Sequence, residues 1–332
     1  MEAERGKPNP GLLYQIGLGF MGAKFMFAAG ELGLFEKLGE GPATLTELAK
    51  RLGIEPRMAR MVSDANVGLG LVERDGEHYR NSPTAQAFLT GQGPMDLRGL
   101  LRILDRICYP RWQKLADSLK HHRAATEGLA LDADQSVIWQ DGIAAFTLMV
   151  ARMLPDAYDF SSHRVLADLG GGTGSFLLPV LRRYPGLKGV LYEMPNVIEL
   201  ARPLLDAQSI ADRVELVDGD VLFDPLPRHA DVSLVANVMH VLSAAHNIQL
   251  LRRIREAAPT GARVLLVDMW TDPTHSQPSL AALMAGEFHL VTGEGDVYSV
   301  DEVKGWFAET GWRFVEHRPV AGITSLIVGE VP

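Results

Sequence analysis

The sequence predicts an α/β protein in which a helical, winged-helix-like unit precedes a larger, doubly wound domain with a parallel sheet. Two observations carry this prediction. Short capped helices and one hairpin occupy residues 20–105, and apolar strands alternate with amphipathic helices from residue 164 onward. We place the domains at 1–105 and 106–332. A chain of 332 residues is long enough for two cores.

Capping and turn signals define the N-terminal unit. Thr44 and Glu47 form a capping box for a helix that ends at Gly53, and Pro56 begins a second helix. The dipeptide Asp75-Gly76 lies between two extended segments, which predicts a β-hairpin with these two residues at its turn. Two helices followed by a hairpin are the pattern of a winged helix.

The most apolar stretch of the chain, Leu12 to Phe35, precedes these elements. It contains Lys24, and its longest uncharged run, Gly11 to Ala23, is shorter than the roughly 20 residues of a membrane span. We therefore expect a helix from Phe20 to Phe35 whose apolar faces pack against a second copy of the chain. The first ten residues lack the basic start and apolar core of a signal peptide.

The rest of the chain is predicted to be helical over 96–155 and to alternate afterwards. Apolar runs such as 264–267 indicate strands buried on both faces, as in a parallel sheet covered by helices on both sides. We expect strands at 164–170, 189–193, 214–220, 231–240 and 262–270, helices at 175–184, 196–208, 244–257 and 300–311, a longer insertion before the last helix, and two final strands.

Charge and cysteine content argue against several classes of function. The formal net charge is −9, whereas a protein that binds nucleic acid through phosphates needs a basic face. The helix at 57–70 offers Arg57 and Arg60 to DNA but also Asp64, so we predict no nucleic-acid partner. Cys108 is the only cysteine, which fits a reducing, cytoplasmic location. We also predict no membrane partner.

A glycine-rich loop follows the first strand of the α/β domain. It reads Asp168-Leu169-Gly170-Gly171-Gly172-Thr173-Gly174 and leads into a helix, so a ligand has access to the backbone and to the helix N-terminus. The dinucleotide pattern G-x-G-x-x-G fails because Ser175 stands at its last position. The loop is therefore typical of a site for a ligand without a pyrophosphate.

Acidic residues end the next two strands. Glu193 ends the second strand, where a carboxylate accepts hydrogen bonds from both hydroxyls of a ribose. Asp220 ends the third strand, where a carboxylate accepts the hydrogens of an adenine amino group. One strand-end acid alone is ordinarily only solvated, but the loop and two acids at successive strand ends together predict an adenosine-containing ligand.

These segments also carry a family resemblance. Residues 168–174 (DLGGGTG), 192–198 (YEMPNVI), 219–227 (GDVLFDPLP) and 238–242 (VMHVL) are similar, in order and spacing, to S-adenosylmethionine-dependent methyltransferases. The specific likeness is to small-molecule O-methyltransferases of the acetylserotonin and caffeic acid type, and it covers nearly the whole chain.

The resemblance implies a fold, a cofactor and an assembly. It implies a Rossmann-like class I methyltransferase domain with a seven-stranded sheet, an N-terminal dimerisation domain, and a homodimeric transferase of secondary metabolism. The methyl donor would be S-adenosylmethionine, leaving S-adenosylhomocysteine as product. The expected cofactor-binding residues are Asp168, Gly170, Gly172, Gly174, Glu193, Asp220 and Asn237.

The acceptor side departs from the family pattern. His240 follows the fourth strand, where the resemblance places the general base, and Asp268 matches an acid that steadies this base. A second such acid aligns with Val297, so its carboxylate is lost unless Asp296 replaces it. We predict methyl transfer to a hydroxyl of a small aromatic or ketonic metabolite, with His240 and Asp268 as catalytic residues.

His289 leaves an alternative open. It lies where the family has apolar or amide side chains that line the substrate, and it either lines the pocket or shares a metal with His240. Some relatives of this fold use a histidine-bound metal to methylate the carbon next to a 2-oxo acid. We rank this metal-assisted C-methylation second because two histidines are few ligands for a metal. A non-methylating enzyme on the same fold is a further alternative.

The acceptor itself is not identified by the sequence. Five further side chains are expected either to line the acceptor pocket or to pack in the core: Trp112, Met149, Met153, Trp270 and Phe288.

Overall fold

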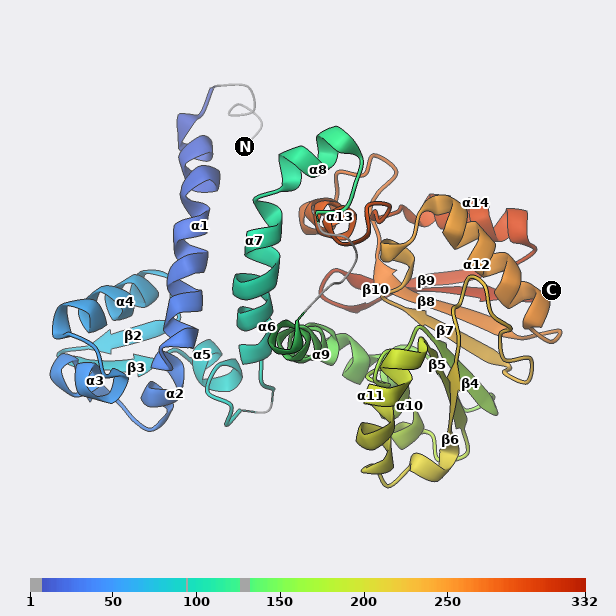
Figure 1. Ribbon diagram of the computed structural model, residues 1–332, viewed down its shortest axis with the longest axis horizontal. Helices are drawn as coiled ribbons and strands as arrows, with labels where there is room; N and C mark the ends of the chain where they lie inside the picture. Colours follow the sequence, from blue (N-terminus) through green and yellow to red (C-terminus); the bar gives the residue numbers. More distant parts are fainter. Residues whose placement is uncertain (1–7, 94, 126–131) are drawn as a thin grey trace. The chain divides into compact units, whose positions relative to one another are not determined.

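The computed structural model describes residues 8–93, 95–125 and 132–332 (Figure 1). It divides into two compact units, Met1–Pro110 with Leu131–Phe146 and Arg111–Ala130 with Thr147–Pro332. The predicted single boundary at 105/106 differs from this division, because helix α9 (Ala133–Ala157) begins in one unit and ends in the other. Residues 1–7 lie outside the described residues. They make up most of the ten-residue segment in which the sequence predicts no signal peptide.

The first unit contains the expected capped helices and hairpin. The Thr44 side chain accepts a hydrogen bond from the Glu47 N–H, and the Glu47 side chain accepts one from the Thr44 N–H, so the capping box is confirmed. Its elements are α1 (Pro10–Glu31), α2 (Leu34–Gly39), β1 (Ala43–Thr44), α3 (Leu45–Leu52), α4 (Pro56–Gly68), β2 (Val72–Asp75), β3 (His78–Asn81), α5 (Pro83–Phe88), α6 (Arg98–Ile103), the π-helix η2 (Leu104–Cys108) and α7 (Tyr109–Trp112), which runs into the second unit.

Two local predictions in this unit need correction. The single helix expected up to Phe35 is interrupted at Gly33, whose φ of 75° starts a separate helix, α2. In the hairpin, Asp75 pairs with His78, so the turn residues are Gly76 and Glu77 rather than Asp75 and Gly76. The reason is that the left-handed φ of 59° required by the turn falls on Gly76, the residue that adopts it without strain.

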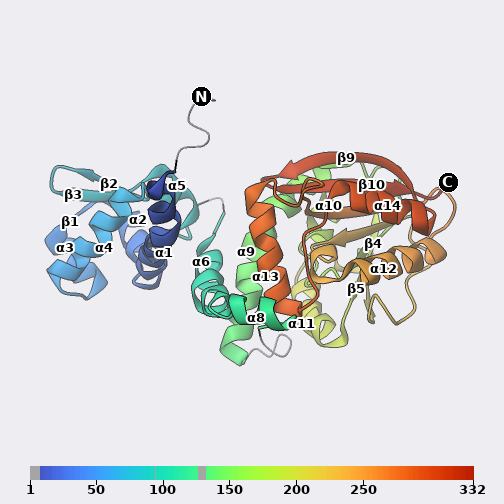
Figure 2. The ribbon, with the colours of Figure 1, turned by 90° about the horizontal axis from the view of Figure 1, so that it is seen from above.

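The second unit is built on a seven-stranded sheet with the order β6-β5-β4-β7-β8-β10-β9. Strands β4 to β8 are mutually parallel, and β10 runs antiparallel to both of its neighbours, β8 and β9. Strands β9 and β10 lie side by side at one end of the sheet (Figure 2). The strands are β4 (Val165–Leu169), β5 (Lys188–Glu193), β6 (Val214–Asp218), β7 (Val232–Ala236), β8 (Arg263–Met269), β9 (Arg313–Ala321) and β10 (Thr324–Glu330). The doubly wound α/β prediction is confirmed.

Helices cover both faces of this sheet because successive strand residues point to opposite sides. Leu166 packs in a core with helices α10 and α11 and the end of α9, whereas Ala167 packs in a second core with α12 and α14. The helices of the unit, besides α7 and α9, are α8 (Leu115–His121), α10 (Leu177–Arg183), α11 (Pro195–Asp206), η3 (Ala211–Arg213), η4 (Met239–Val241), α12 (Ala244–Ala257), α13 (Ser279–Thr292) and α14 (Val300–Thr310).

Two elements near the predicted site differ from expectation. The insertion before the last helix contains a helix of its own, α13. Strand β7 ends at Ala236 instead of His240, because Asn237 takes a left-handed φ of 57° and turns the chain into the short helix η4. His240 therefore lies on a turn beyond the sheet edge and not on the strand.

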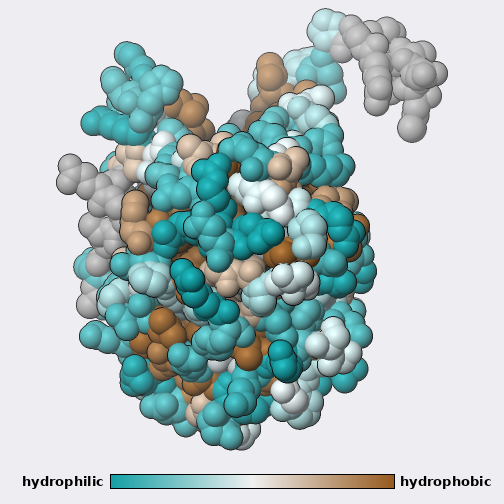
Figure 3. Space-filling view, turned by 90° about the vertical axis from the view of Figure 1, so that its right-hand side faces the viewer, coloured by the Kyte–Doolittle hydropathy of each residue, from teal (hydrophilic) through white to brown (hydrophobic). Residues whose placement is uncertain are grey.

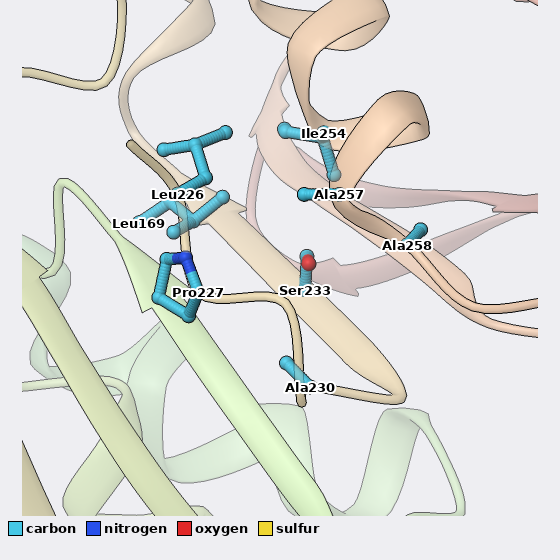
Figure 4. A pocket seen from close by; sticks show the side chains of 8 residues that line it. All are labelled: Leu169, Leu226, Pro227, Ala230, Ser233, Ile254, Ala257 and Ala258. Carbon is cyan, nitrogen blue, oxygen red and sulfur yellow. The ribbon is translucent and has the colours of Figure 1, made fainter. Parts of the chain in front are cut away.

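One other face of the α/β unit and one crevice inside it also bear on where a ligand could bind. The face turned to the viewer in Figure 3 is mostly hydrophilic, with small, scattered hydrophobic patches. A crevice between β4, β7 and α12 (Figure 4) has no room for a water-sized molecule. It is a packing gap, lined by Leu169, Leu226, Pro227, Ala230, Ser233, Ile254, Ala257 and Ala258.

Candidate active site

The glycine loop after β4 has the backbone that the sequence predicted for a ligand cradle. Gly170, Gly172 and Gly174 have φ values of 71°, 58° and 86°, a region that L side chains rarely adopt. At Gly172 nothing lies within 4 Å of where a Cβ would stand. This glycine therefore serves the backbone conformation and leaves open space above the loop.

Backbone N–H groups hold the two strand-end acids in place. Glu193 accepts hydrogen bonds from the N–H of Gly172 (3.0 Å) on Oε2 and from the N–H of Met194 (2.8 Å) on Oε1. Asp220 accepts one from the N–H of Leu222 at 2.7 Å. Each carboxylate oxygen has more than one acceptor position, so both acids retain capacity for a ligand.

Asp168, below the same loop, is completely buried. Neither carboxylate oxygen has a hydrogen-bond partner among the described residues. Burial, and next to it the negative charge of Glu193, raise the pKa of Asp168 to about 7. The nearby N–H of Leu177 is not in hydrogen-bonding geometry and offsets this shift only in part. An unpartnered acid beneath an open cradle is what a cationic ligand would compensate.

Asp268 fixes the imidazole of His240. Its Oδ1 lies 2.6 Å from His240 Nδ1, and its Oδ2 accepts the backbone N–H of His240 at 3.3 Å. A carboxylate only accepts, so Nδ1 carries the proton and Nε2 presents its lone pair. Among the described residues Nε2 has no hydrogen-bond partner, and His240 is 7% exposed. This is the geometry of an oriented base.

Two further contacts hold the same histidine. The phenyl ring of Phe288 stacks on the imidazole, with 3.6 Å between ring centroids and 16° between planes. The N–H of Asp296 donates to the His240 carbonyl at 3.0 Å. The Asp296 carboxylate, however, accepts the N–H of Val297 at 2.7 Å. Within the described residues Asp268 is the carboxylate on the ring, so Asp296 contributes its backbone and does not replace the missing acid.

The other residues predicted to line the acceptor pocket differ in burial and in their contacts. Trp270 is 5% exposed in the core, where its indole N–H donates to the Ser325 carbonyl, which favours the packing alternative. Met149 and Met153 are 44% and 45% exposed on α9. Trp112 donates its indole N–H to the carboxylate of Glu287.

Within the described chain, His289 makes no hydrogen bond or ring contact with His240. Its Nε2 is buried without a hydrogen-bond partner there, and the ring that faces His240 is that of Phe288. Over residues 8–93, 95–125 and 132–332, no three His, Cys, Asp or Glu side chains gather as a metal would require. The pairing of His240 with His289 stays a prediction without a contact that supports it.

Sequence reasoning missed the buried ion pair between Arg111 and Glu287, whose side chains are 5% and 11% exposed. The two residues are 176 positions apart, so no local pattern joins them. One signal was present, because Glu287 is the one Asp, Glu, Lys or Arg in the mostly apolar segment 284–291. A carboxylate in an otherwise apolar helix usually needs a buried partner.

Comparison with known proteins agrees with this geometry. Residues 112–313 match the sequence model of the O-methyltransferase domain, and residues 14–91 match that of the O-methyltransferase dimerisation domain. The chain is 31% identical to the tetracenomycin polyketide synthesis 8-O-methyl transferase of Streptomyces glaucescens, over 98% of this chain and 97% of that protein. It is 33% identical to the N,N-dimethyltransferase OxyT of Streptomyces rimosus, over 91% and 90%.

A solved structure of human N-acetylserotonin methyltransferase in complex with SAM superimposes with a TM-score of 0.86 at 25% identity, covering 98% of this chain and 99% of that one. The domain match alone spans more than half of the chain. The chain therefore belongs to the O-methyltransferase family and is an S-adenosylmethionine-dependent methyltransferase, as its strand-end motifs predicted.

Proposed function

We propose that this protein methylates a hydroxyl oxygen of a small aromatic or ketonic metabolite, with His240 as the general base. The observation that carries the proposal is the imidazole held by Asp268 with Nε2 unpartnered at the ligand edge of the sheet. The names of relatives support an aromatic hydroxyl, among them a 3-hydroxy-5-methyl-1-naphthoate 3-O-methyltransferase of Streptomyces sahachiroi that is 31% identical over 91% of this chain.

The residues at the donor side fit S-adenosylmethionine, which supplies an electrophilic methyl group when bound. We assign its ribose to Glu193 and its adenine to Asp220, because both carboxylates are fixed by backbone N–H groups and keep acceptor capacity. The glycines 170, 172 and 174 provide the cradle, and Asn237 provides the turn that brings η4 beside it. The partnerless carboxylate of Asp168 balances the donor's positive charge.

His240 then acts on the acceptor. Nε2 takes the hydroxyl proton as the oxygen becomes nucleophilic, and the resulting imidazolium keeps its Nδ1–H on Asp268. Because Asp268 also accepts the N–H groups of His240 and Met269, its carboxylate does not turn away as charge develops. A positioned base of this kind contributes about 10²–10⁴-fold for a phenol.

The test is turnover of labelled donor by His240→Ala against a panel of phenols, 2-oxo acids and amines. We expect the variant to lose about 10²–10⁴ in kcat for a hydroxyl acceptor and to keep its affinity for the donor. The matched control is His246→Ala, since His246 is paired with Glu294 on the surface. Full activity of His240→Ala would refute the base assignment. Activity that requires a metal and is lost in chelator would establish the C-methylation alternative instead.

We also propose that the chain works as a cytoplasmic homodimer. Helix α1 and the Asp134–Ala157 part of α9 are each long and apolar enough to cross a membrane by length and composition. On α1, however, Leu13, Tyr14 and Ile16 are 73%, 68% and 70% exposed. The matched dimerisation domain begins at residue 14. A second copy would cover these side chains. A monomer at micromolar concentration in sedimentation, or co-fractionation with membranes, would contradict this.

A further inference from the structure

We propose that Glu287 is a positioning residue, which together with Arg111 and Trp112 fixes helix α13 so that Phe288 holds the His240 ring in its reactive orientation. The inference rests on His240 being the base. It adds a layer behind that base, built from residues that do not touch the reacting atoms.

The carboxylate of Glu287 is used on both oxygens. Oε1 accepts from the Arg111 guanidinium at 2.9 Å, and Oε2 accepts the indole N–H of Trp112. The Arg111 side chain is 5% exposed and that of Glu287 is 11% exposed. Two adjacent residues of α7 therefore donate hydrogen bonds to one carboxylate of α13. Because these groups lie away from bulk water, the hydrogen bonds are strong and directional.

Packing beside this carboxylate restricts the helix further. A Cβ built on Gly286 would lie 3.1 Å from Cη2 of Trp112, tighter than an ordinary contact. The indole therefore lies against the backbone of Gly286 while its N–H reaches the next residue, Glu287. Contacts to two consecutive residues define both the rotation and the axial position of α13.

The next residue along the helix carries this restraint to the base. Neighbouring side chains on a helix diverge by about 100°, so a helix held through Glu287 on one side directs Phe288 to another. Phe288 there stacks on His240 with ring centroids 3.6 Å apart. Gly295 closes the arrangement, since a Cβ on it would be 2.6 Å from the His240 carbonyl oxygen and 2.9 Å from Phe288. A small rotation of α13 would slide the phenyl ring off the imidazole.

Structural stability alone does not account for this choice of residues. A buried ion pair is often no more stable than apolar side chains of the same volume. What the pair adds over apolar packing is direction, because two donors from α7 must meet two oxygens of α13. The proposal therefore predicts that restoring stability without the carboxylate does not restore the rate.

The first variant is Glu287→Gln, with Glu309→Gln as control because Glu309 forms an exposed pair with Arg252. We expect kcat to fall at least tenfold in Glu287→Gln, the donor Kd to change less than twofold, and the control to resemble the parent. The kcat against pH profile should shift in Glu287→Gln. In NMR spectra of Glu287→Gln, the Trp112 indole N–H signal and the His240 ring signals should both shift. The first signal is assigned by its loss in Trp112→Phe, and the second set by its loss in His240→Ala.

Two more variants separate a loss of catalytic rate from a loss of folded protein. Trp112→Phe removes one donor to Glu287 and keeps the ring, so a smaller loss of kcat is expected. The double variant Arg111→Met with Glu287→Leu removes both charges, and its Tm should recover relative to Glu287→Leu alone while kcat stays low. Recovery of kcat together with Tm would overturn the proposal, as would unchanged His240 signals in Glu287→Gln. An active His240→Ala would instead overturn the proposed function, whatever the NMR signals show.

Discussion

The donor half and the acceptor half of the site are built in opposite ways. In the donor half, the functional groups stand within a few residues of a strand end, as Glu193 does at the end of β5, and short loops fix them. In the acceptor half, His240 depends on Asp268 from β8, on Phe288 from α13 and, through Glu287, on Arg111 from α7. In the proposed site, local geometry would thus hold the cofactor-binding groups, and tertiary packing would hold the groups that act on the acceptor.

This difference fits the two tasks. The cofactor is invariant, so a rigid loop that follows a buried strand suffices to present backbone N–H groups and carboxylates to it. The acceptor must be aligned with the methyl group, and such alignment lowers the barrier by up to about 7–11 kcal/mol. If α13 forms the acceptor wall, as the proposed function implies, its place in an insertion outside the sheet allows the pocket to change while the cofactor site stays the same.

The largest effect is expected from substitution of Asp268, which should reduce kcat without changing donor affinity. In Asp268→Asn the side chain keeps its shape but no longer stabilises charge on Nδ1 of His240, so we expect kcat to fall by about 10²–10⁴. The donor Kd should remain unchanged, because within the described chain the Asp268 carboxylate bonds to His240 and Met269 and not to the donor-side loops. Steady-state kinetics with calorimetry of donor binding measures both. Asp301→Asn, an exposed pair with Lys304, is the control.

The same contrast explains what the sequence predicted well. The sequence placed the glycine loop, Glu193 and Asp220 at strand ends because each stands at or just beyond the end of a strand, which is the ligand edge of a parallel sheet. Their roles toward the donor stay predictions. The sheet itself was predicted for the same reason. The Asp268 match to His240 came from family resemblance, and a contact spanning 28 residues then proved to join them.

What sequence reasoning missed depended on distant contacts. Helix α13 was left inside an insertion because it is apolar on most sides and shows no amphipathic period. The Arg111 partner of Glu287 comes from 176 residues away. For Trp270 the sequence left pocket lining and core packing open, and distant contacts decide for the core, since Ser325 on β10 offers the carbonyl that the buried indole N–H requires.

A second prediction sharpens the comparison from the donor side. Glu193→Ala removes charge-assisted hydrogen bonds of about 1.5–3 kcal/mol each, so donor affinity should weaken at least tenfold. With saturating donor, kcat should change little, because His240 and its supports come from other elements. Calorimetric titration with S-adenosylhomocysteine gives the Kd, and Glu199→Ala, on the exposed side of α11, is the control. Equal affinities in parent and variant would contradict the ribose assignment.

The last prediction concerns the effect of pH on Asp168. Burial, with the charge of Glu193, raises the pKa of this carboxyl to about 7 in the folded protein, against roughly 3.9 when unfolded. Between these values the native state binds more protons than the unfolded state, so this group alone makes the free energy of unfolding decrease as pH rises from about 4 to about 7. Asp168→Asn should therefore flatten this part of the stability curve in denaturant titrations.

The Asp168 carboxyl should also make donor affinity depend on pH, and affinity should rise with pH where the free energy of unfolding falls. A positively charged donor favours the ionised form of Asp168, so binding near pH 7 should release protons and strengthen with rising pH. The affinity should rise by less than about tenfold per pH unit, because one carboxyl releases at most one proton. Calorimetry in two buffers of different ionisation enthalpy measures that proton directly, and Asp168→Asn should abolish it. Equal binding heats in both buffers would show that Asp168 does not change its protonation when the donor binds, and would contradict the proposal that the donor's positive charge draws the proton from this carboxyl.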